Sequence, residues 1–208
     1  MARCLAPIGT GMFYFHSKAL DGDVDHLRYA EPVPKELAKF DPRNIYGGGA
    51  AVSSVNVPTR LLIKGRKRKL LDIANALHIY IVTRAVIDII GNFQREIQYF
   101  PVQCVWKDGS DAGQLFWLFT TVLLDAVHRE KTTMPWQVAS AQSPVSGYWR
   151  EQIGATFAFD KAKMGNAHFW KDPHGLTLGP LVSDALFEAL IKANISGFHT
   201  EAEHFEEV

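Results

Sequence analysis

The sequence has few cysteines, no excess of charge and no long hydrophobic segment, and each shortage excludes a class of protein. Its two cysteines, Cys4 and Cys104, form no C-x-x-C motif, which excludes a disulfide framework and a C-x-x-C zinc or redox site. Basic and acidic residues both number 22, which argues against nucleic acid as an obligate partner because such binding draws on a basic surface. No apolar run reaches the roughly 20 residues of a membrane-spanning helix, so we expect no membrane partner.

The first residues also lack the apolar core of a signal peptide, which together with the shortage of cysteines predicts a cytoplasmic location. Motifs of nucleotide binding are missing, because no helix start follows the three glycines 47–49 at the required spacing. No nucleophile stands at a family-type spacing from a histidine and a carboxylate. We therefore predict a protein that is not an enzyme and that uses no cofactor or metal ion.

Apolar residues are well represented, at 47% of the chain, and 12% of the residues are aromatic. The 208 residues are enough for one sizeable domain with a well-filled core. Residues 1–60 hold proline and glycine at a density that breaks regular elements. We predict an irregular N-terminal region over 1–60, packed on an α+β domain over 61–208. Within the first region, a strand at Met12–His16 and a helix at Pro34–Phe40 are the best candidates for regular structure.

Regular patterns become clear from His78 onward. Alternating or β-branched apolar residues predict strands at His78–Val82, Ile97–Trp106, Leu115–Leu124, Thr156–Asp160 and Ala167–Lys171. Two short helices are predicted: one over Arg84–Ile90 with Thr83 as N-cap, and one that begins at Asp184 with Ser183 as N-cap.

The connections predict mainly antiparallel pairing. An Asp-Gly turn joins Ile97–Trp106 to Leu115–Leu124, so the two form a hairpin that would place Trp106 near Phe116. Met134–Gln152 is expected to be a loop packed by aromatic residues. Because hairpin signals outnumber crossovers, we predict a single α+β domain with mainly antiparallel strands and a few short helices.

The central stretch of the chain, Leu115–Thr132, changes character abruptly. Its first ten residues are nearly all apolar or β-branched, as in a strand buried on both faces, with Trp117 in the core. Five ionisable residues then follow within seven positions: Asp125, His128, Arg129, Glu130 and Lys131. These charges either form a solvated turn that pairs within itself, or bring Asp125 or Glu130 into contact with a partner or a neighbouring strand.

Two further charged stretches have alternative interpretations. The basic run Lys64–Lys69 is a solvated loop or a patch for nucleic acid or an acidic partner. The acidic end, with Glu201, Glu203, Glu206 and Glu207, is a solvated tail or a surface that mimics a phosphate backbone and enters a basic cleft. His199, Glu201, Glu203 and His204 could alternatively supply metal ligands for a hydrolase.

The order of the motifs carries a resemblance. The pieces are I-V-T-R-A-V-I-D-I-I-G (81–91), I-Q-Y-F-P-V (97–102), F-W-L-F (116–119), L-L-D-A-V-H-R-E-K-T (123–132), G-N-A-H-F-W (165–170) and V-S-D-A-L-F-E-A-L-I-K-A-N-I-S-G-F (182–198). In this order, over roughly Leu61–Val208, the chain resembles the eleventh-numbered family of bacterial polymorphic-toxin immunity proteins.

The resemblance implies a non-enzymatic antitoxin that binds and neutralises a toxin made by the same or a sister cell. The partner would be the cognate toxin domain, a protein. We expect the toxin-binding residues among the acidic side chains: Glu201, Glu203, Glu206, Glu207, Asp125 and Glu130. A metal-dependent hydrolase and a nucleic-acid-binding regulator remain the alternative functions.

Overall fold

The computed structural model describes residues 2–4, 16–22, 27, 49–64, 66–76, 79–138, 147–149, 155–174, 179–198 and 205–207. Within these ranges the chain is rich in strands, most of them antiparallel, and has three helices. The predicted α+β class is confirmed. No helix in the described ranges is both long enough and apolar enough to cross a membrane.

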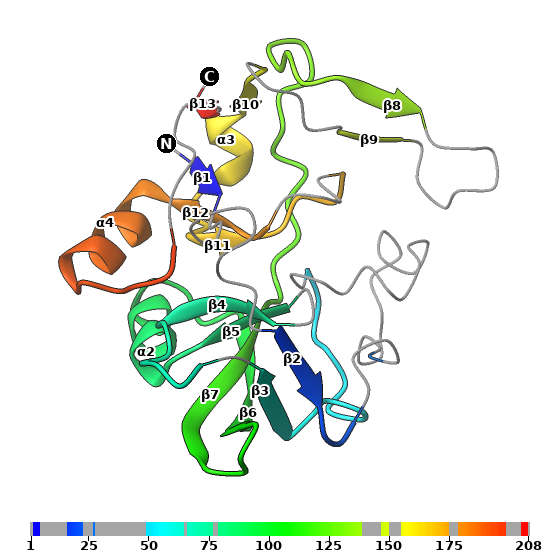
Figure 1. Ribbon diagram of the computed structural model, residues 1–208. Helices are drawn as coiled ribbons and strands as arrows, with labels where there is room; N and C mark the ends of the chain where they lie inside the picture. The colour runs from blue at the N-terminus through cyan, green and yellow to red at the C-terminus, as the bar shows by residue number, and fades with distance from the viewer. Residues whose placement is uncertain are drawn as a thin grey trace.

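A six-stranded sheet forms the lower half of the molecule in Figure 1. In spatial order its strands are β2 (His16–Ala19), β3 (Arg60–Lys64), β6 (Ile97–Trp106), β7 (Asp111–Thr120), β5 (Ile79–Val82) and β4 (Ile73–Ala76). All neighbours are antiparallel except β3 and β6, which are parallel. The β6–β7 hairpin is its longest pairing, and the strand predicted at Ile97–Trp106 is confirmed with both its ends.

Strand β7 is buried on both faces because alternate residues serve two different cores. Trp117 and Phe119 belong to a cluster on one face that also takes in Leu27 and Val52 from the N-terminal region. Trp117 is 1% exposed, and its indole Nε1 donates to the carbonyl of Pro58 at 2.8 Å. The prediction that Trp117 is a core residue is confirmed.

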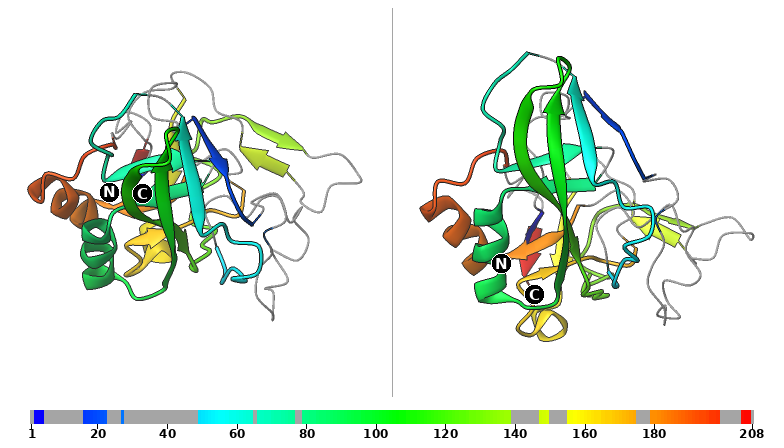
Figure 2. Two further views of the ribbon diagram at one scale, coloured as in Figure 1. Left: turned by 60° about the horizontal axis from the view of Figure 1, so that its bottom comes forward. Right: turned by 90° about the horizontal axis from the view of Figure 1, so that it is seen from below.

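The other face of the sheet is covered by two amphipathic helices, α2 (Arg84–Phe93) and α4 (Asp184–Lys192), which lie together on one side in Figure 2. Leu118 of β7 packs in the cluster that they form. Ser183 caps α4 as predicted, because its Oγ accepts from the backbone N–H of Leu186 at 3.3 Å. The side chain of Thr83, predicted to cap α2, makes no such bond and donates to Asp72 instead.

The upper half of the molecule is assembled from short strands around a third core. These elements are the antiparallel sheet of β1 (Ala2–Cys4), β12 (Leu181–Ser183) and β11 (Phe169–Trp170), the parallel pair of β10 (Phe157–Phe159) and β13 (Phe205–Glu207), the hairpin of β8 (Trp136–Val138) and β9 (Gly147–Trp149), and helix α3 (Lys161–Met164). Their core is rich in aromatic rings, including Trp149, Phe159 and Trp170.

A buried amide joins the two halves. The side-chain N–H of Gln94 donates to the carbonyl of Phe169 at 2.6 Å. Its oxygen accepts from the backbone N–H groups of His168 and Phe169, both at 2.9 Å. Gln94 lies at the end of α2 and is 7% exposed. These bonds therefore supply the hydrogen-bond partners that water would otherwise give to its amide and to the backbone at the edge of β11.

Three predictions about element bounds are wrong. The strand predicted at Leu115–Leu124 runs instead over Asp111–Thr120, because pairing begins directly after the turn. Phe116 therefore pairs with Pro101 and lies far along the hairpin from Trp106. Residues 122–124 leave the sheet for the third core, so one apolar run serves three cores.

The other two corrections concern α2 and the aromatic loop. Helix α2 continues through Gly91 to Phe93. Met134–Gln152, predicted to be a loop, contains the β8–β9 hairpin. The helix predicted at Pro34–Phe40, and all of the strand predicted at Met12–His16 except its last residue, lie outside the described residues.

Candidate partner-binding surface

The charged residues that follow β7 lie on the segment that crosses from the lower sheet to the upper half of the molecule (Figure 1). The side chains of Asp125 and Arg129 are 46% and 57% exposed, and an Arg129 nitrogen lies 3.8 Å from an Asp125 oxygen. Glu130 is exposed and, within the described ranges, forms no ion pair. The stretch therefore pairs partly within itself while presenting two carboxylates to solvent.

Backbone hydrogen bonds fix the shape of this segment. The N–H of His128 donates to the carbonyl of Ala158 at 2.7 Å, and Asp160 N–H donates to the carbonyl of Ala126 at 2.8 Å. The carbonyl of His128 accepts from the N–H of Thr132 at 3.0 Å and so closes a turn. Because Ala126 and Val127 are buried, the charged side chains stand on a rigid base beside β10.

An aromatic assembly lies beside these charges. The guanidinium of Arg129 lies over the ring of Trp136, 5.1 Å from its centroid. Trp136 also packs edge-on against Trp149 at 4.8 Å and against the imidazole of His174 at 5.2 Å. His174 Nε2 is 3.9 Å from an Asp125 oxygen. We call Asp125, Arg129, Trp136, Trp149 and His174 the Trp136 cluster.

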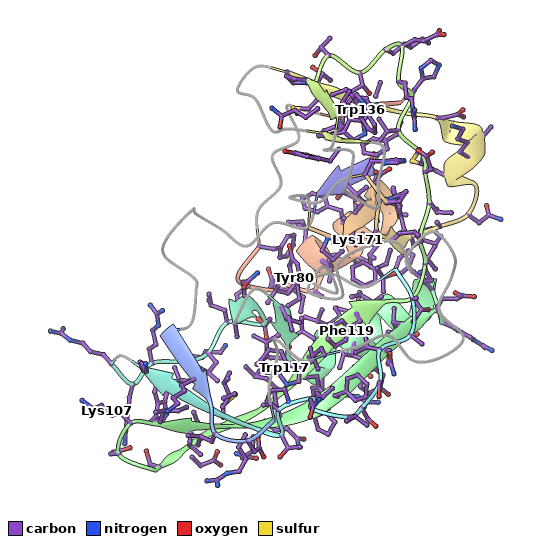
Figure 3. The ribbon with its side chains drawn as sticks, turned by 90° about the vertical axis from the view of Figure 1, so that its right-hand side faces the viewer. Tyr80, Lys107, Trp117, Phe119, Trp136 and Lys171 are labelled. Atoms are coloured by element: carbon purple, nitrogen blue, oxygen red, sulfur yellow. The ribbon has the colours of Figure 1, made fainter. Side chains whose placement is uncertain are left out.

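The Trp136 cluster is held in place by its neighbours. His174 Nδ1 is 3.2 Å from the carbonyl oxygen of Gly147, and its backbone carbonyl accepts from Trp149 N–H at 3.1 Å. A Cβ at Gly147 would overlap the ring of Trp136, so only glycine permits the close approach of β9 to that ring. Figure 3 shows Trp136 at the upper end of the molecule, far from Lys107.

Charge density in the sequence indicates Asp125 as a candidate, but no sequence pattern indicates the cluster as a unit. Its members come from the crossing segment, from β8, from β9 and from the segment after β11. Arg129 stacked on a half-buried tryptophan resembles the centre of a protein interface, where tryptophan, tyrosine and arginine carry most of the binding energy. The side chains are already ordered by one another, so binding would cost little further side-chain entropy.

The acidic end of the chain comes close to the same region through the backbone. Strand β13 pairs in parallel with β10, with Ala158 opposite Glu206 and Phe159 opposite Glu207. Phe159 also forms an antiparallel bridge with Val127. Strand β10 therefore lies between the Glu206–Glu207 backbone and the crossing segment. Glu201 and Glu203 lie outside the described residues.

The metal-ligand hypothesis rests on residues that the structure does not describe. In the part of the chain that the structure describes, no group of three or more His, Cys, Asp or Glu side chains is placed to hold a metal ion. His199, Glu201, Glu203 and His204, the proposed ligands, lie outside that part.

Comparison with known proteins agrees with the resemblance found in the sequence. No curated protein sequence matches the chain. The family described as "Immunity protein family (Imm11)" matches residues 30–203, which is most of the chain and includes every element from β3 to α4. The protein belongs to the Imm11 immunity protein family.

Proposed function

We propose that this protein is a cytoplasmic antitoxin that binds a cognate bacterial toxin and neutralises it without catalysis. The family match over residues 30–203 is the observation that carries this proposal. The toxin would belong to a polymorphic toxin system used in competition between bacteria. No cofactor is needed, because steric blockage of a toxin requires only a complementary surface.

We propose the Trp136 cluster as the centre of that surface, with Asp125 and Glu130 at its charged rim. Arg129 and Trp136 supply the residue types that dominate binding energy when water is excluded from them. Asp125 and Glu130 supply negative charge that would complement a basic cleft on the toxin. The pairing of β13 with β10 supports adding Glu206 and Glu207 to this rim, with Glu201 and Glu203 as further candidates.

Neutralisation is tested by producing the protein together with the toxin encoded beside its gene. We expect growth to be rescued and the two proteins to elute as one complex. Persistent toxicity despite a soluble, folded antitoxin, or failure to form a complex, would contradict the proposal.

The position of the surface is tested by Arg129→Ala. Truncating a residue at the centre of an interface costs more than about 1 kcal/mol, or more than about fivefold in Kd. Arg84→Ala is a matched control, because Arg84 is also exposed, also lies over an aromatic ring, that of Tyr99 at 5.5 Å, and also faces a carboxylate. Equal weakening by both variants, or by neither, would place the interface elsewhere.

The contribution of the acidic side chains is tested separately by the rate at which the protein associates with the toxin. Replacing Glu201, Glu203, Glu206 and Glu207 with glutamine should slow association at low salt and leave it nearly unchanged at high salt, where charge is screened. Asp125→Asn combined with Glu130→Gln tests the rim in the same way. Unchanged rates at low ionic strength would remove the substituted carboxylates from the binding surface.

A further inference from the structure

The end of the six-stranded sheet that lies opposite the Trp136 cluster carries a concentration of positive charge. We define the basic tip as seven exposed side chains: Lys18, Lys64, Arg66, Lys67, Arg68, Lys69 and Lys107. Figure 3 shows Lys107 at the far end of the molecule from Trp136. The chain as a whole has a net charge of zero, so this local excess is a departure from its average surface.

The sheet topology brings these residues together from three segments. Strands β3 and β6 are parallel, with Ile63 opposite Trp106, so Lys64 and Lys107 follow at the same end of the sheet. Lys67, which follows β3, contacts the β6–β7 turn, because its Nζ lies 2.6 Å from an Asp108 oxygen. This contact and the hydrogen bonds from Ser110 lower the pKa of Asp108 well below its usual range. The tip is therefore a defined surface, with its loop fastened to the β6–β7 turn.

The carboxylates near the tip are already engaged in internal contacts. Asp108 binds Lys67 and accepts from Ser110. Asp111 Oδ1 accepts from Gln103 at 2.6 Å and from Gly113 N–H at 2.7 Å. In the described part of the chain, the basic side chains of the tip other than Lys67 form no ion pair. Most of the positive charge is therefore available to a partner.

We infer that the basic tip binds an acidic face of the toxin protein, at a second contact separate from the Trp136 cluster. This inference rests on the proposed function for the identity of the partner, and on charge complementarity for its chemistry. A protein fits better than nucleic acid for two reasons. The chain as a whole has no net positive charge to attract a phosphate backbone, and the segments 64–69 and 107–111 contain no aromatic side chain on which bases could stack.

The test compares association kinetics of the complex with the toxin encoded by the neighbouring gene. Lys64, Arg66, Arg68 and Lys69 are changed together to glutamine, which leaves the Lys67–Asp108 contact in place. The matched control changes four exposed basic residues elsewhere on the surface: Arg84, Arg95, Lys163 and Lys192. At low salt we expect the tip variant to associate about tenfold or more slowly than wild type, and the control to change much less. The difference should shrink at high salt.

Three outcomes would overturn either the inference or the proposed function on which it rests, and each outcome can be told apart from the others. If wild-type protein neither binds nor neutralises the toxin, the proposed function fails and takes the tip with it. If wild type binds and the folded tip variant associates equally fast at low salt, only the tip inference fails. A partner-free check titrates the protein with polyglutamate and with a short DNA duplex while backbone amide NMR signals are followed. Shifts at residues 64–69 and 107 should come with polyglutamate, and tighter binding of DNA would contradict an acidic protein partner.

Discussion

The carboxylate of Asp72 and the side chain of Ser196 bind each other reciprocally across 124 residues of sequence. Asp72 Oδ2 accepts from Ser196 Oγ at 2.6 Å and from Ser196 N–H at 3.0 Å. Ser196 Oγ in turn accepts from Asp72 N–H at 3.1 Å, and Thr83 Oγ1 donates to Asp72 Oδ1 at 3.2 Å. These bonds fasten the chain after α4 to the start of β4.

The first prediction follows from this contact and depends on pH. Burial alone would raise the pKa of Asp72, but the hydrogen bonds from Ser196 and Thr83 outweigh it and lower the pKa. A lowered folded-state pKa means that the ionised carboxylate stabilises the fold at any pH well above its unfolded value, about 3.9. This contribution is lost as pH falls through the lower, folded-state pKa.

Asp72→Asn should therefore lower the free energy of unfolding at pH 7 by about 2 kcal/mol, the scale of hydrogen bonds to a charged group. The loss should shrink below pH 4, which urea denaturation at several pH values would measure. Asp88→Asn is the control, because Asp88 is 58% exposed in its pair with Arg84 and should change stability by less than about 0.5 kcal/mol. Equal effects of both substitutions at pH 7 would contradict the role assigned to Asp72.

Gly197 gives a second prediction, because its backbone has φ +94° and a Cβ there would overlap the carbonyl oxygen of Ile73. Gly197→Ala should be destabilising through both the left-handed conformation and the clash. Gly109 has φ +81° with no atom within 4 Å of a built Cβ, so Gly109→Ala measures the conformational cost alone. Thermal unfolding should show a clearly larger loss at Gly197, and equal losses would mean that the close approach to Ile73 is relaxed in solution.

The third prediction concerns the cap of α4. Ser183→Ala should lower the free energy of unfolding by about 1 kcal/mol, because the N–H of Leu186 loses its acceptor. Ser183 Oγ also lies 2.7 Å from His168 Nδ1. Ser183→Thr keeps a hydroxyl at the cap and should recover most of the loss. A denaturation midpoint that is the same for Ser183→Ala and wild type would show that the cap contributes nothing.

Trp117 supports a fourth prediction, which separates ring volume from hydrogen bonding. Trp117→Ala should cost roughly 3–5 kcal/mol, because a large fully buried side chain is lost. Trp117→Phe keeps much of the volume but leaves the carbonyl of Pro58 without its donor, so it should cost less than Trp117→Ala. A soluble and fully stable Trp117→Ala protein would contradict the burial of this side chain.

Local patterns predicted those parts of the fold that depend on neighbouring residues. The limits of β6 and the Ser183 cap follow from alternation and from one side chain beside a helix start, and both are confirmed. The course of residues 120–124 could not be predicted in this way. A buried strand and a buried crossing segment have the same apolar composition, and only tertiary packing decides where pairing stops at Thr120.

The candidate surface likewise has one part that local sequence predicts and another that only tertiary packing determines. Charge density alone pointed to Asp125 and Glu130, and Asp125 does lie in the Trp136 cluster. Trp136 and His174 are separated from Asp125 by 11 and 49 positions in the sequence and meet it only through the packing of β8, β9 and the segment after β11. No spacing rule connects residues on three separate elements, so the aromatic centre of the surface became visible only in the folded chain.

The pairing of β1 with β12 has a consequence for the order in which the protein forms during synthesis. Ala2 lies opposite Ser183, so β1 leaves the ribosome well before its partner strand β12 has been made. At about 5–20 residues per second, that delay is roughly 10 to 35 s. The β6–β7 hairpin closes from adjacent residues during this interval. A nascent chain would thus carry a finished lower sheet while the groups that β1 and β11 offer to β12 stay open to chaperones and proteases.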